Sequence, residues 1–165
     1  MKILLDKNKN FYKGNMHCHS NLSDGKLTPF ELKEKYKSNG YNFLAITDHE
    51  FVKSHSYLDD EDFLTITSSE YAIKEFPNQS TLVNFNMKVC HLNIYAKKQD
   101  NEYSVCYNSV LDHYSKGEHR ENINRDKDEY QRVYGKDGIN ELIRKINEAG
   151  FVYISTVAHS ASCFK

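Results

Sequence analysis

Three potential metal ligands, His17, His19 and Asp24, lie within eight residues, directly after a short apolar and aromatic run. In a β-strand, side chains two positions apart point to the same face, so His17 and His19 would converge at the end of that strand. Asp24 stands in a Ser-Asp-Gly turn, where Gly25 frees the backbone to fold back and bring the carboxylate to the same place. A mixed set of nitrogen and oxygen ligands suits Zn, Mn or Fe better than Ca or Mg. The motif therefore predicts a site for one of these ions.

The length and composition indicate one globular domain over residues 1–165, because a chain of 165 residues can bury a substantial core. Apolar residues make up 39% of the chain and charged residues 27%, as in water-soluble proteins. The segment 1–11 has only three consecutive apolar residues and no later run reaches a spanning length, so we expect no membrane span and a cytoplasmic location. The formal net charge of −1 offers no bulk attraction to nucleic acid or to an anionic membrane.

The cysteines show neither a Cys-x-x-Cys pair nor dense spacing, which argues against a zinc ribbon or a disulfide scaffold. In a reducing cytosol we expect free thiols. Cys18 and Cys90 each adjoin a candidate histidine ligand, and we expect both side chains to point away from it into the packed side. The four cysteines are Cys18, Cys90, Cys106 and Cys163.

A helix begins after the first motif. Thr28 is the expected cap, Pro29 stands at the first helical position, and Glu31 completes a capping box with Thr28. The helix should run to about Asn39, because Gly40 is a typical residue for the turn that ends a helix.

The rest of the chain alternates between apolar runs that are typical of buried strands and one clear amphipathic helix. Strands are expected at 41–47, 63–67, 88–96 and 151–157, and the helix at 138–150, with Asp137 as its cap and Gly150 as its stop. This alternation predicts a parallel α/β arrangement, barrel-like or part of a barrel. We expect 71–87 to be a loop and 97–136 to be a polar insertion or long connection, in which 124–134 could be helical.

Metal-competent side chains come at the carboxyl ends of successive predicted strands, with His91 inside the fourth strand and His159 just after the last. In parallel α/β folds the carboxyl ends of the strands meet at one edge, where binding sites are built. Simpler interpretations remain open, since a strand histidine can belong to the core, a glutamate to a loop, and the last histidine to coincidence. The candidates are His17 and His19, Asp48 and His49, Glu70, His91 and His159. We expect His55, His113 and His119 to face solvent, and the acidic run 59–62 to be a solvated turn.

These residues resemble the PHP (polymerase and histidinol phosphatase) superfamily. The chain is most similar to its metal-dependent phosphoesterases, whose signature is His-x-His-x-x-x-Ser-Asp-Gly followed by Thr-Asp-His. The resemblance covers about residues 12–96 and resumes weakly at 150–160. It rests on the blocks 17–20 with 23–25, 45–49, 69–70 and 90–93, together with Pro29, Glu31 and Gly40.

The resemblance implies a distorted (β/α)7 barrel with two or three divalent metal ions, Zn, Mn or Fe, in its mouth. By this likeness His17 and His19 would bind one ion. Glu70 would bridge it to a second ion, which His91 and His159 would also hold. Asp24 and His49 would help to hold a third ion, and Asp48 would orient a metal-bound imidazole.

Hydrolysis of a phosphate ester needs an activated water and positive charge against the phosphoryl oxygens, and closely spaced metal ions supply both. No serine or cysteine nucleophile with a paired base is evident, so we expect a metal-activated water as the nucleophile. The expected substrate is a small phosphorylated metabolite, a nucleotide or an oligonucleotide end.

The chain departs from the family pattern at its end. Family members continue past the histidine that corresponds to His159 and finish with a Gly-x-Asp-x-His block that completes two metal sites, whereas this chain stops at Lys165. We therefore expect a barrel that is incomplete at the C-terminus, in either a fragment or a degenerate protein. The alternatives to an active phosphoesterase are a catalytically impaired metal-binding remnant and a polymerase-type exonuclease module.

Overall fold

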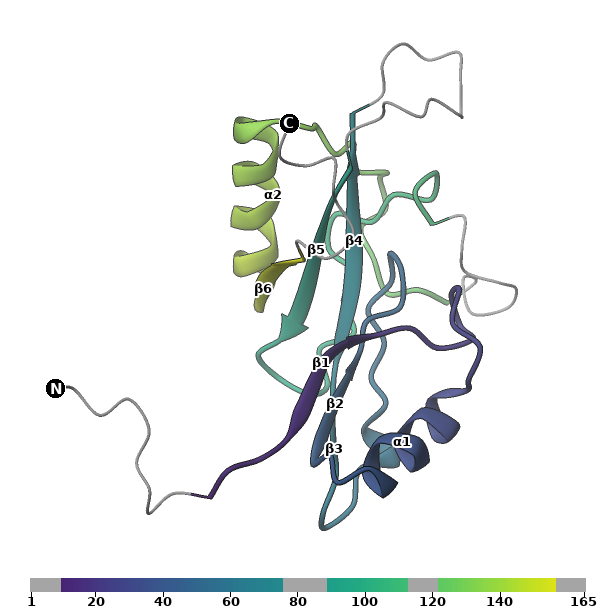
Figure 1. Cartoon of the computed structure of the whole chain (residues 1–165). Coiled ribbons are helices and arrows are strands. Elements are labelled where there is room, and N and C mark those ends of the chain that lie inside the picture. The colour runs from purple at the N-terminus through teal and green to yellow at the C-terminus, as the bar shows by residue number, and fades with distance from the viewer. Residues whose placement is uncertain (1–9, 76–88, 113–121, 157–165) are drawn as a thin grey trace, which may run out of the picture.

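The structure, a computed structural model, describes residues 10–75, 89–112 and 122–156. These residues form a mixed α/β fold with two three-stranded sheets and two α-helices (Figure 1). The α/β class predicted from the sequence is therefore confirmed, whereas the sequence-predicted parallel arrangement holds for only one of the two sheets.

The first sheet is parallel and carries the first sequence motif. Its strands are β1 (Gly14–Cys18), β2 (Phe43–Ile46) and β3 (Leu64–Ile66), and they stand in that order. The helix α1 (Pro29–Ser38) lies between β1 and β2 in the chain. The predicted strand, helix, strand unit is thus confirmed, and it brings the carboxyl ends of β1 and β2 to the same edge.

The limits of α1 follow from local chemistry. The Thr28 side chain accepts a hydrogen bond from the Glu31 N–H, and the Glu31 carboxylate accepts one from the Thr28 N–H, so the capping box forms as predicted. After the helix, Gly40 adopts φ 74°, a conformation that glycine takes without a steric penalty. Leu32 packs from α1 into a small core beneath the first sheet, with Leu44, Ile46 and Phe63.

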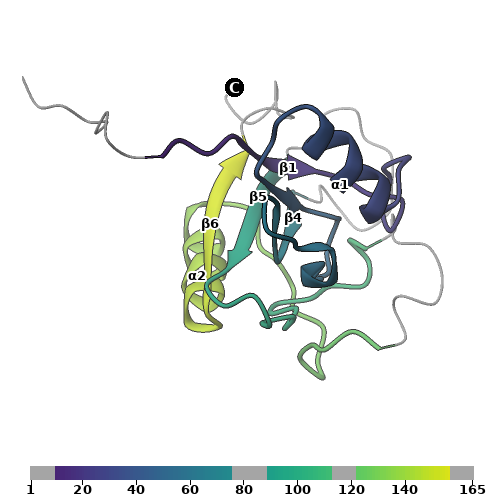
Figure 2. The same ribbon diagram turned by 90° about the horizontal axis from the view of Figure 1, so that it is seen from below.

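The second sheet is antiparallel. It consists of β4 (Ser68–Lys74), β5 (Val89–Ala96) and β6 (Phe151–Thr156), in that order, and α2 (Lys136–Glu148) packs beside β6 (Figures 1 and 2). The parallel prediction is wrong for these strands. A continuous apolar run indicates a buried strand but says nothing of its direction, so periodicity alone could not distinguish the two arrangements.

Two boundaries also differ from the sequence-based expectation. The predicted loop 71–87 begins as strand, because β4 continues to Lys74 and the side chains of Tyr71 and Ile73 are fully buried. The helix α2 begins at Lys136 and is preceded by Gly135, so Asp137 lies inside its first turn instead of capping it.

The polar stretch 97–136 contributes to the core more than its composition suggests. Its side chains Val105, Cys106 and Tyr107 are buried, and the first two join the main core cluster with Leu142 and Ile146 of α2. The possible helix at 124–134 does not form. The described parts of this stretch, 97–112 and 122–135, are therefore irregular but packed against the core.

The two sheets meet where the chain leaves β2. His49 and Glu70 form a parallel bridge, in which the Glu70 N–H donates to the Asp48 carbonyl oxygen (3.1 Å) and the Glu50 N–H donates to the Glu70 carbonyl oxygen (2.9 Å). The Tyr95 hydroxyl of β5 also donates to the Met16 carbonyl oxygen of β1 (2.7 Å). These bonds fix the candidate ligands of both sheets relative to one another.

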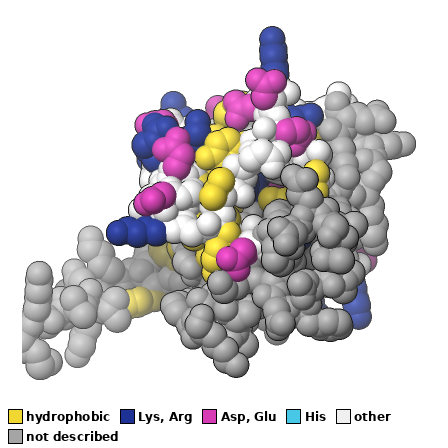
Figure 3. Space-filling model, turned by 90° about the horizontal axis from the view of Figure 1, so that it is seen from above, with side chains coloured by type: hydrophobic (Ala, Val, Ile, Leu, Met, Phe, Trp, Pro, Cys, Tyr) yellow, Lys and Arg dark blue, Asp and Glu magenta, His cyan; other side chains and the backbone are white. Residues whose placement is uncertain are grey.

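The surface seen from above shows basic and acidic side chains interspersed around a narrow strip of hydrophobic ones (Figure 3). Among the described residues, no helix combines the length and the apolar character that crossing a membrane requires.

Candidate metal centre

The loop after β1 is held in place by a buried carboxylate. Asp48, 1% exposed, accepts hydrogen bonds from the Ser20 N–H (2.7 Å), the Ser20 hydroxyl (2.6 Å) and the Ser23 hydroxyl (2.6 Å). The resemblance implies that Asp48 orients a metal-bound imidazole. In the described part of the chain its carboxylate instead anchors the loop that carries His19 and Asp24.

Gly25 closes this loop at a point where the backbone leaves no space for a side chain. A Cβ atom at this position would lie 2.2 Å from the His19 carbonyl oxygen and 2.7 Å from the Ser20 carbonyl oxygen. Its N–H donates to the Ser20 carbonyl oxygen (2.9 Å). The position requires glycine because the backbone of His19 and Ser20 passes too close for a side chain. The reason expected from the sequence was the conformational freedom of glycine.

Glu70 lies at the centre of four imidazoles, and its side chain is only 1% exposed. The oxygen Oε1 lies 3.8 Å from His17 Nε2 and 3.0 Å from His91 Nδ1. The other oxygen, Oε2, lies 3.1 Å from His19 Nε2 and 3.3 Å from His49 Nδ1. Each carboxylate oxygen therefore faces two imidazole nitrogens, an arrangement that a bridging carboxylate would have.

A second carboxylate joins the same cluster from the loop. Asp24 Oδ1 lies 2.8 Å from His19 Nδ1, and Asp24 Oδ2 lies 3.5 Å from His49 Nε2. Two overlapping groups of three side chains thus have ligand atoms within 4.8 Å of one another and share His19. They are His17, His19 and Glu70, and His19, Asp24 and His49.

Unsatisfied buried atoms show that these residues fit a metal ion. Among the described residues, both oxygens of Glu70 and both ring nitrogens of His19 are buried and lack a hydrogen-bond partner of acceptable geometry. Leaving such atoms buried and unpaired costs free energy, and a cation among them would satisfy their lone pairs. Imidazole nitrogens and carboxylate oxygens are ligands that Zn, Mn and Fe accept.

Thr47 determines which nitrogen of His17 is available. The Thr47 hydroxyl donates to the Cys18 carbonyl oxygen (3.2 Å), so it accepts the short hydrogen bond from His17 Nδ1 (2.7 Å). This bond places the proton on Nδ1 and directs the lone pair of Nε2 toward Glu70. Thr47 belongs to the Thr-Asp-His block, but the motif alone gives no sign of this role.

The charges around Glu70 shift the pKa values of the ligands in different directions. Burial would raise the pKa of Glu70, but His19 and His91 outweigh it and hold that pKa well below its usual range. Burial opposes protonation of His19, yet Glu70 and Asp24 raise its pKa. Burial, reinforced by His19, lowers the pKa of His49 to about 4, so its imidazole is neutral at pH 7.

Among the described ligand candidates Asp24 is the most exposed, with 45% of its side chain open to solvent. Burial would raise its pKa, but the nearby His19 and His49 lower it. The carboxylate is therefore ionised at neutral pH and remains accessible from outside the protein.

The structure brings together six of the seven candidate ligands predicted from the sequence, while His159 lies outside the described residues. The expectation that His91 comes from a parallel strand is wrong. His91 lies near the start of β5, and it reaches the cluster because β5 runs antiparallel to β4. Glu70 pairs with Asn93, and His91 shares a strand face with Asn93 because side chains alternate along a strand. The six ligands are His17, His19, Asp24, His49, Glu70 and His91.

The remaining sequence predictions have mixed outcomes. His55 is 2% exposed, so the expectation that it faces solvent is wrong, and His113 and His119 lie outside the described residues. In the acidic run, Asp60 is exposed and forms ion pairs with two lysines of α1. Cys18 and Cys90 pack against the two hydrophobic clusters, as expected.

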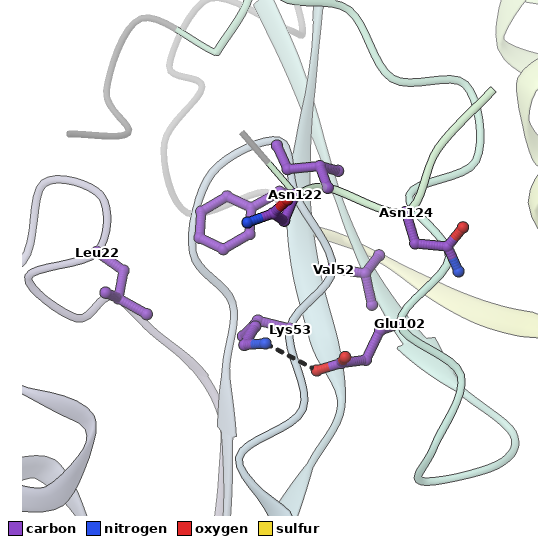
Figure 4. A pocket seen from close by; sticks show the side chains of 8 residues that line it. Leu22, Val52, Lys53, Glu102, Asn122 and Asn124 are labelled. Atoms are coloured by element: carbon purple, nitrogen blue, oxygen red, sulfur yellow. Dashed lines mark ion pairs between the residues drawn. The ribbon is translucent and has the colours of Figure 1, made fainter. Parts of the chain in front are cut away.

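A pocket of about 220 Å³ lies between the loop after β1 and the chain that follows His49 (Figure 4). Apolar side chains of both segments line it, and an ion pair joins Lys53 Nζ to Glu102 Oε1 across 3.2 Å. The labelled lining residues are Leu22, Val52, Lys53, Glu102, Asn122 and Asn124.

Comparison with known proteins gives partial likenesses. No family model matches the chain. Over 40 residues, which are 24% of this chain and 15% of the relative, the chain is 45% identical to a 5'-3' exoribonuclease of Haemophilus influenzae. A solved structure from Bifidobacterium adolescentis, described as a "putative metal-dependent phosphoesterase", aligns over 55% of this chain and 30% of its own, with 21% identity and a TM-score of 0.36. This chain therefore spans less than a third of the length of each of these two proteins.

Proposed function

We propose that this chain is a metal-dependent phosphoesterase of the PHP type, which hydrolyses a phosphate ester at a centre of two or three divalent ions. The observation that carries the proposal is the buried carboxylate of Glu70, whose two oxygens face four imidazoles and lack a hydrogen bond of acceptable geometry among the described residues. A carboxylate in this position is suited to bridging metal ions.

The ligands divide into groups around Glu70. His17 and His91 face its Oε1, whereas His19 and His49 face its Oε2. Asp24 would complete a further site with His19 and His49. When bound, divalent ions would supply positive charge against the phosphoryl oxygens and the acidity that activates a water molecule.

The protein's own residues support this chemistry. The lowered pKa of Glu70 keeps its carboxylate ionised, and the neutral imidazole of His49 has a lone pair to donate at pH 7. Thr47 orients His17, and the solvent-exposed Asp24 marks the open side of the cluster. The pocket lined by Leu22 and Phe51, which are neighbours in sequence of Asp24 and His49, would give space for the organic group that carries the phosphate.

The barrel fold is part of the same proposal. The parallel first sheet, continued into β4 through the bridge between His49 and Glu70, would form part of the distorted barrel of the PHP superfamily. A cytoplasmic location and Zn, Mn or Fe as the ion also remain proposals.

A direct test compares hydrolysis of an aryl phosphate monoester and diester by metal-depleted protein before and after addition of Zn²⁺ or Mn²⁺. We expect turnover only with metal, and we expect Glu70→Gln to abolish it because this variant removes the central charge while keeping the side-chain size. Glu141→Gln, on the exposed face of α2, is the matched control and should retain full activity. Turnover that persists in Glu70→Gln or in the presence of a chelator would contradict the proposal.

A second candidate substrate is the end of an RNA strand, which the identity over 40 residues to the 5'-3' exoribonuclease favours. It is tested by adding a 5'-phosphorylated oligoribonucleotide to the same assay and separating the products by length. Release of mononucleotides would support this candidate. Hydrolysis of the aryl esters alone would restrict the activity to small substrates.

A further inference from the structure

A buried ion pair involves Glu50, the residue that follows the candidate ligand His49. Arg132 Nη1 lies 2.6 Å from Glu50 Oε2, and each side chain is 1% exposed. The other oxygen of Glu50 accepts a hydrogen bond from the Ala72 N–H (2.8 Å). The guanidinium donates to the carbonyl oxygens of Ala72 (2.9 Å) and Cys106 (3.0 Å) and lies 4.1 Å from the centre of the Tyr71 ring. The pair thus has partners in two other segments, β4 and the chain at Cys106.

Such a pair is a weak source of stability, because removing two charges from water costs about as much as their attraction returns. Glu50 also adopts φ 73°, a left-handed conformation that is unfavourable for residues other than glycine. Glu50, the residue that follows His49, therefore combines a buried charge with an unfavourable backbone conformation. Local strain of this kind persists where the surrounding contacts enforce it, and it is concentrated at functional sites.

The contacts of Glu50 explain how its backbone conformation is held. Its backbone N–H donates to the Glu70 carbonyl oxygen, and its carboxylate binds the Ala72 N–H, so it is fastened to β4 at two points. Arg132 binds both that carboxylate and the Ala72 carbonyl oxygen. The peptide that carries His49 is consequently clamped against the strand that carries Glu70.

We infer that the Glu50–Arg132 pair is a positioning device for His49, which sets its imidazole between Glu70 and Asp24 for metal binding. The inference rests on the proposed metal centre but does not depend on the reaction catalysed there. It assigns a role to Arg132, which lies in the irregular polar segment and is distant in sequence from every ligand.

The test measures the Zn²⁺ affinity of the folded chain by competition with a chromogenic chelator, below the unfolding transition of every variant. Glu50→Gln keeps the hydrogen bond from Ala72 and removes the charge. We expect this variant to lower the Zn²⁺ affinity of the site that includes His49 by about 10- to 100-fold, as is typical when a residue that orients a metal ligand is replaced. His49→Ala should weaken the same site. The combined variant Glu50→Gln with Arg132→Met leaves neither charge buried alone, so it guards against a failure to fold, and we expect the same loss.

A matched control separates positioning from general destabilisation. Leu142→Ala truncates a side chain of α2 that is 1% exposed and belongs to the core cluster that also contains Tyr71. We expect it to lower the unfolding temperature without changing the Zn²⁺ affinity. An equal loss of affinity in Leu142→Ala would overturn the inference, as would unchanged affinity in both Glu50 variants.

A double-mutant cycle identifies the ligand through which the pair acts. In a His49→Ala background, Glu50→Gln should change the Zn²⁺ affinity less than about twofold, whereas in a His91→Ala background it should keep its full effect. The same loss in both backgrounds would overturn the inference. A wild-type chain that binds none of Zn²⁺, Mn²⁺ and Fe²⁺ would overturn both proposals, whereas metal binding without phosphoester hydrolysis would reject only the proposed function.

Discussion

Replacing Thr47 with valine should weaken metal binding although Thr47 is not itself a ligand. The two side chains have nearly the same shape, and residue 47 is fully buried, so the substitution removes a hydroxyl with little change in packing. Two hydrogen bonds disappear with it, one from His17 Nδ1 (2.7 Å) and one to the Cys18 carbonyl oxygen (3.2 Å). His17 then loses the contact that places its proton on Nδ1.

The expected magnitude follows from what the hydroxyl does. Loss of a partner that orients a metal-binding histidine typically lowers metal affinity about 10- to 100-fold. This range corresponds to about 1.4 to 2.8 kcal/mol of binding free energy. The lost hydrogen bonds should in addition lower the free energy of unfolding by about 1 kcal/mol each.

The control is the same substitution at Thr67, which is equally buried and donates to the Gln99 carbonyl oxygen (2.5 Å), outside the ligand cluster. Zn²⁺ titration should show a weaker site in Thr47→Val and wild-type affinity in Thr67→Val. Urea unfolding of the metal-depleted proteins should show a loss of stability in both. Wild-type metal affinity in Thr47→Val, or an equal loss in Thr67→Val, would refute the role assigned to this hydroxyl.

Three further substitutions test the loop and the buried histidine. Gly25→Ala would place a methyl group 2.2 Å from the His19 carbonyl oxygen, so urea unfolding should show a loss of about 1–3 kcal/mol, together with weaker Zn²⁺ binding. Asp48→Asn removes a charge that accepts three buried hydrogen bonds and should cost about 2–4 kcal/mol in the same measurement. Burial lowers the pKa of His55 from 6.5 to about 4, so the unfolded chain binds this proton more readily than the folded chain. Stability should therefore fall as the pH is lowered from 6.5 to 4, by about 3 kcal/mol more in the wild type than in His55→Leu. Parallel pH profiles for the two proteins would contradict this assignment.

The sequence predicted the features that depend on neighbouring residues. The capping box of α1 and its glycine stop are local signals, and the structure contains both. The pair His17 and His19 was predicted to converge because alternation along a strand is also a local property. Its inclusion in one cluster with Glu70 was expected because strand ends meet at one edge, but the structure has Glu70 inside β4, bridged to His49 just beyond the end of β2.

Other features depend on contacts between distant segments, and periodicity does not encode them. The direction of β5 could not be read from its apolar run, so the reason given for the position of His91 was wrong although the residue lies in the cluster. The pairing of Glu50 with Arg132 was missed because the arginine lies in a polar stretch without a regular pattern. Burial of His55 was missed for the same reason, since a single polar residue in a loop gives no sign of its surroundings.

The charge balance of the cluster explains why it suits a divalent cation. Glu70 is ionised and almost completely buried, and Asp24 adds a second negative charge at the open side. In the absence of a cation, the raised pKa of His19 lets a proton supply part of the missing positive charge. A metal ion bound by His19 would displace that proton, because imidazole binds a metal only through an unprotonated nitrogen. Protons and divalent ions therefore compete for the same buried negative charge, and the neutral imidazole of His49 favours the metal ion at neutral pH.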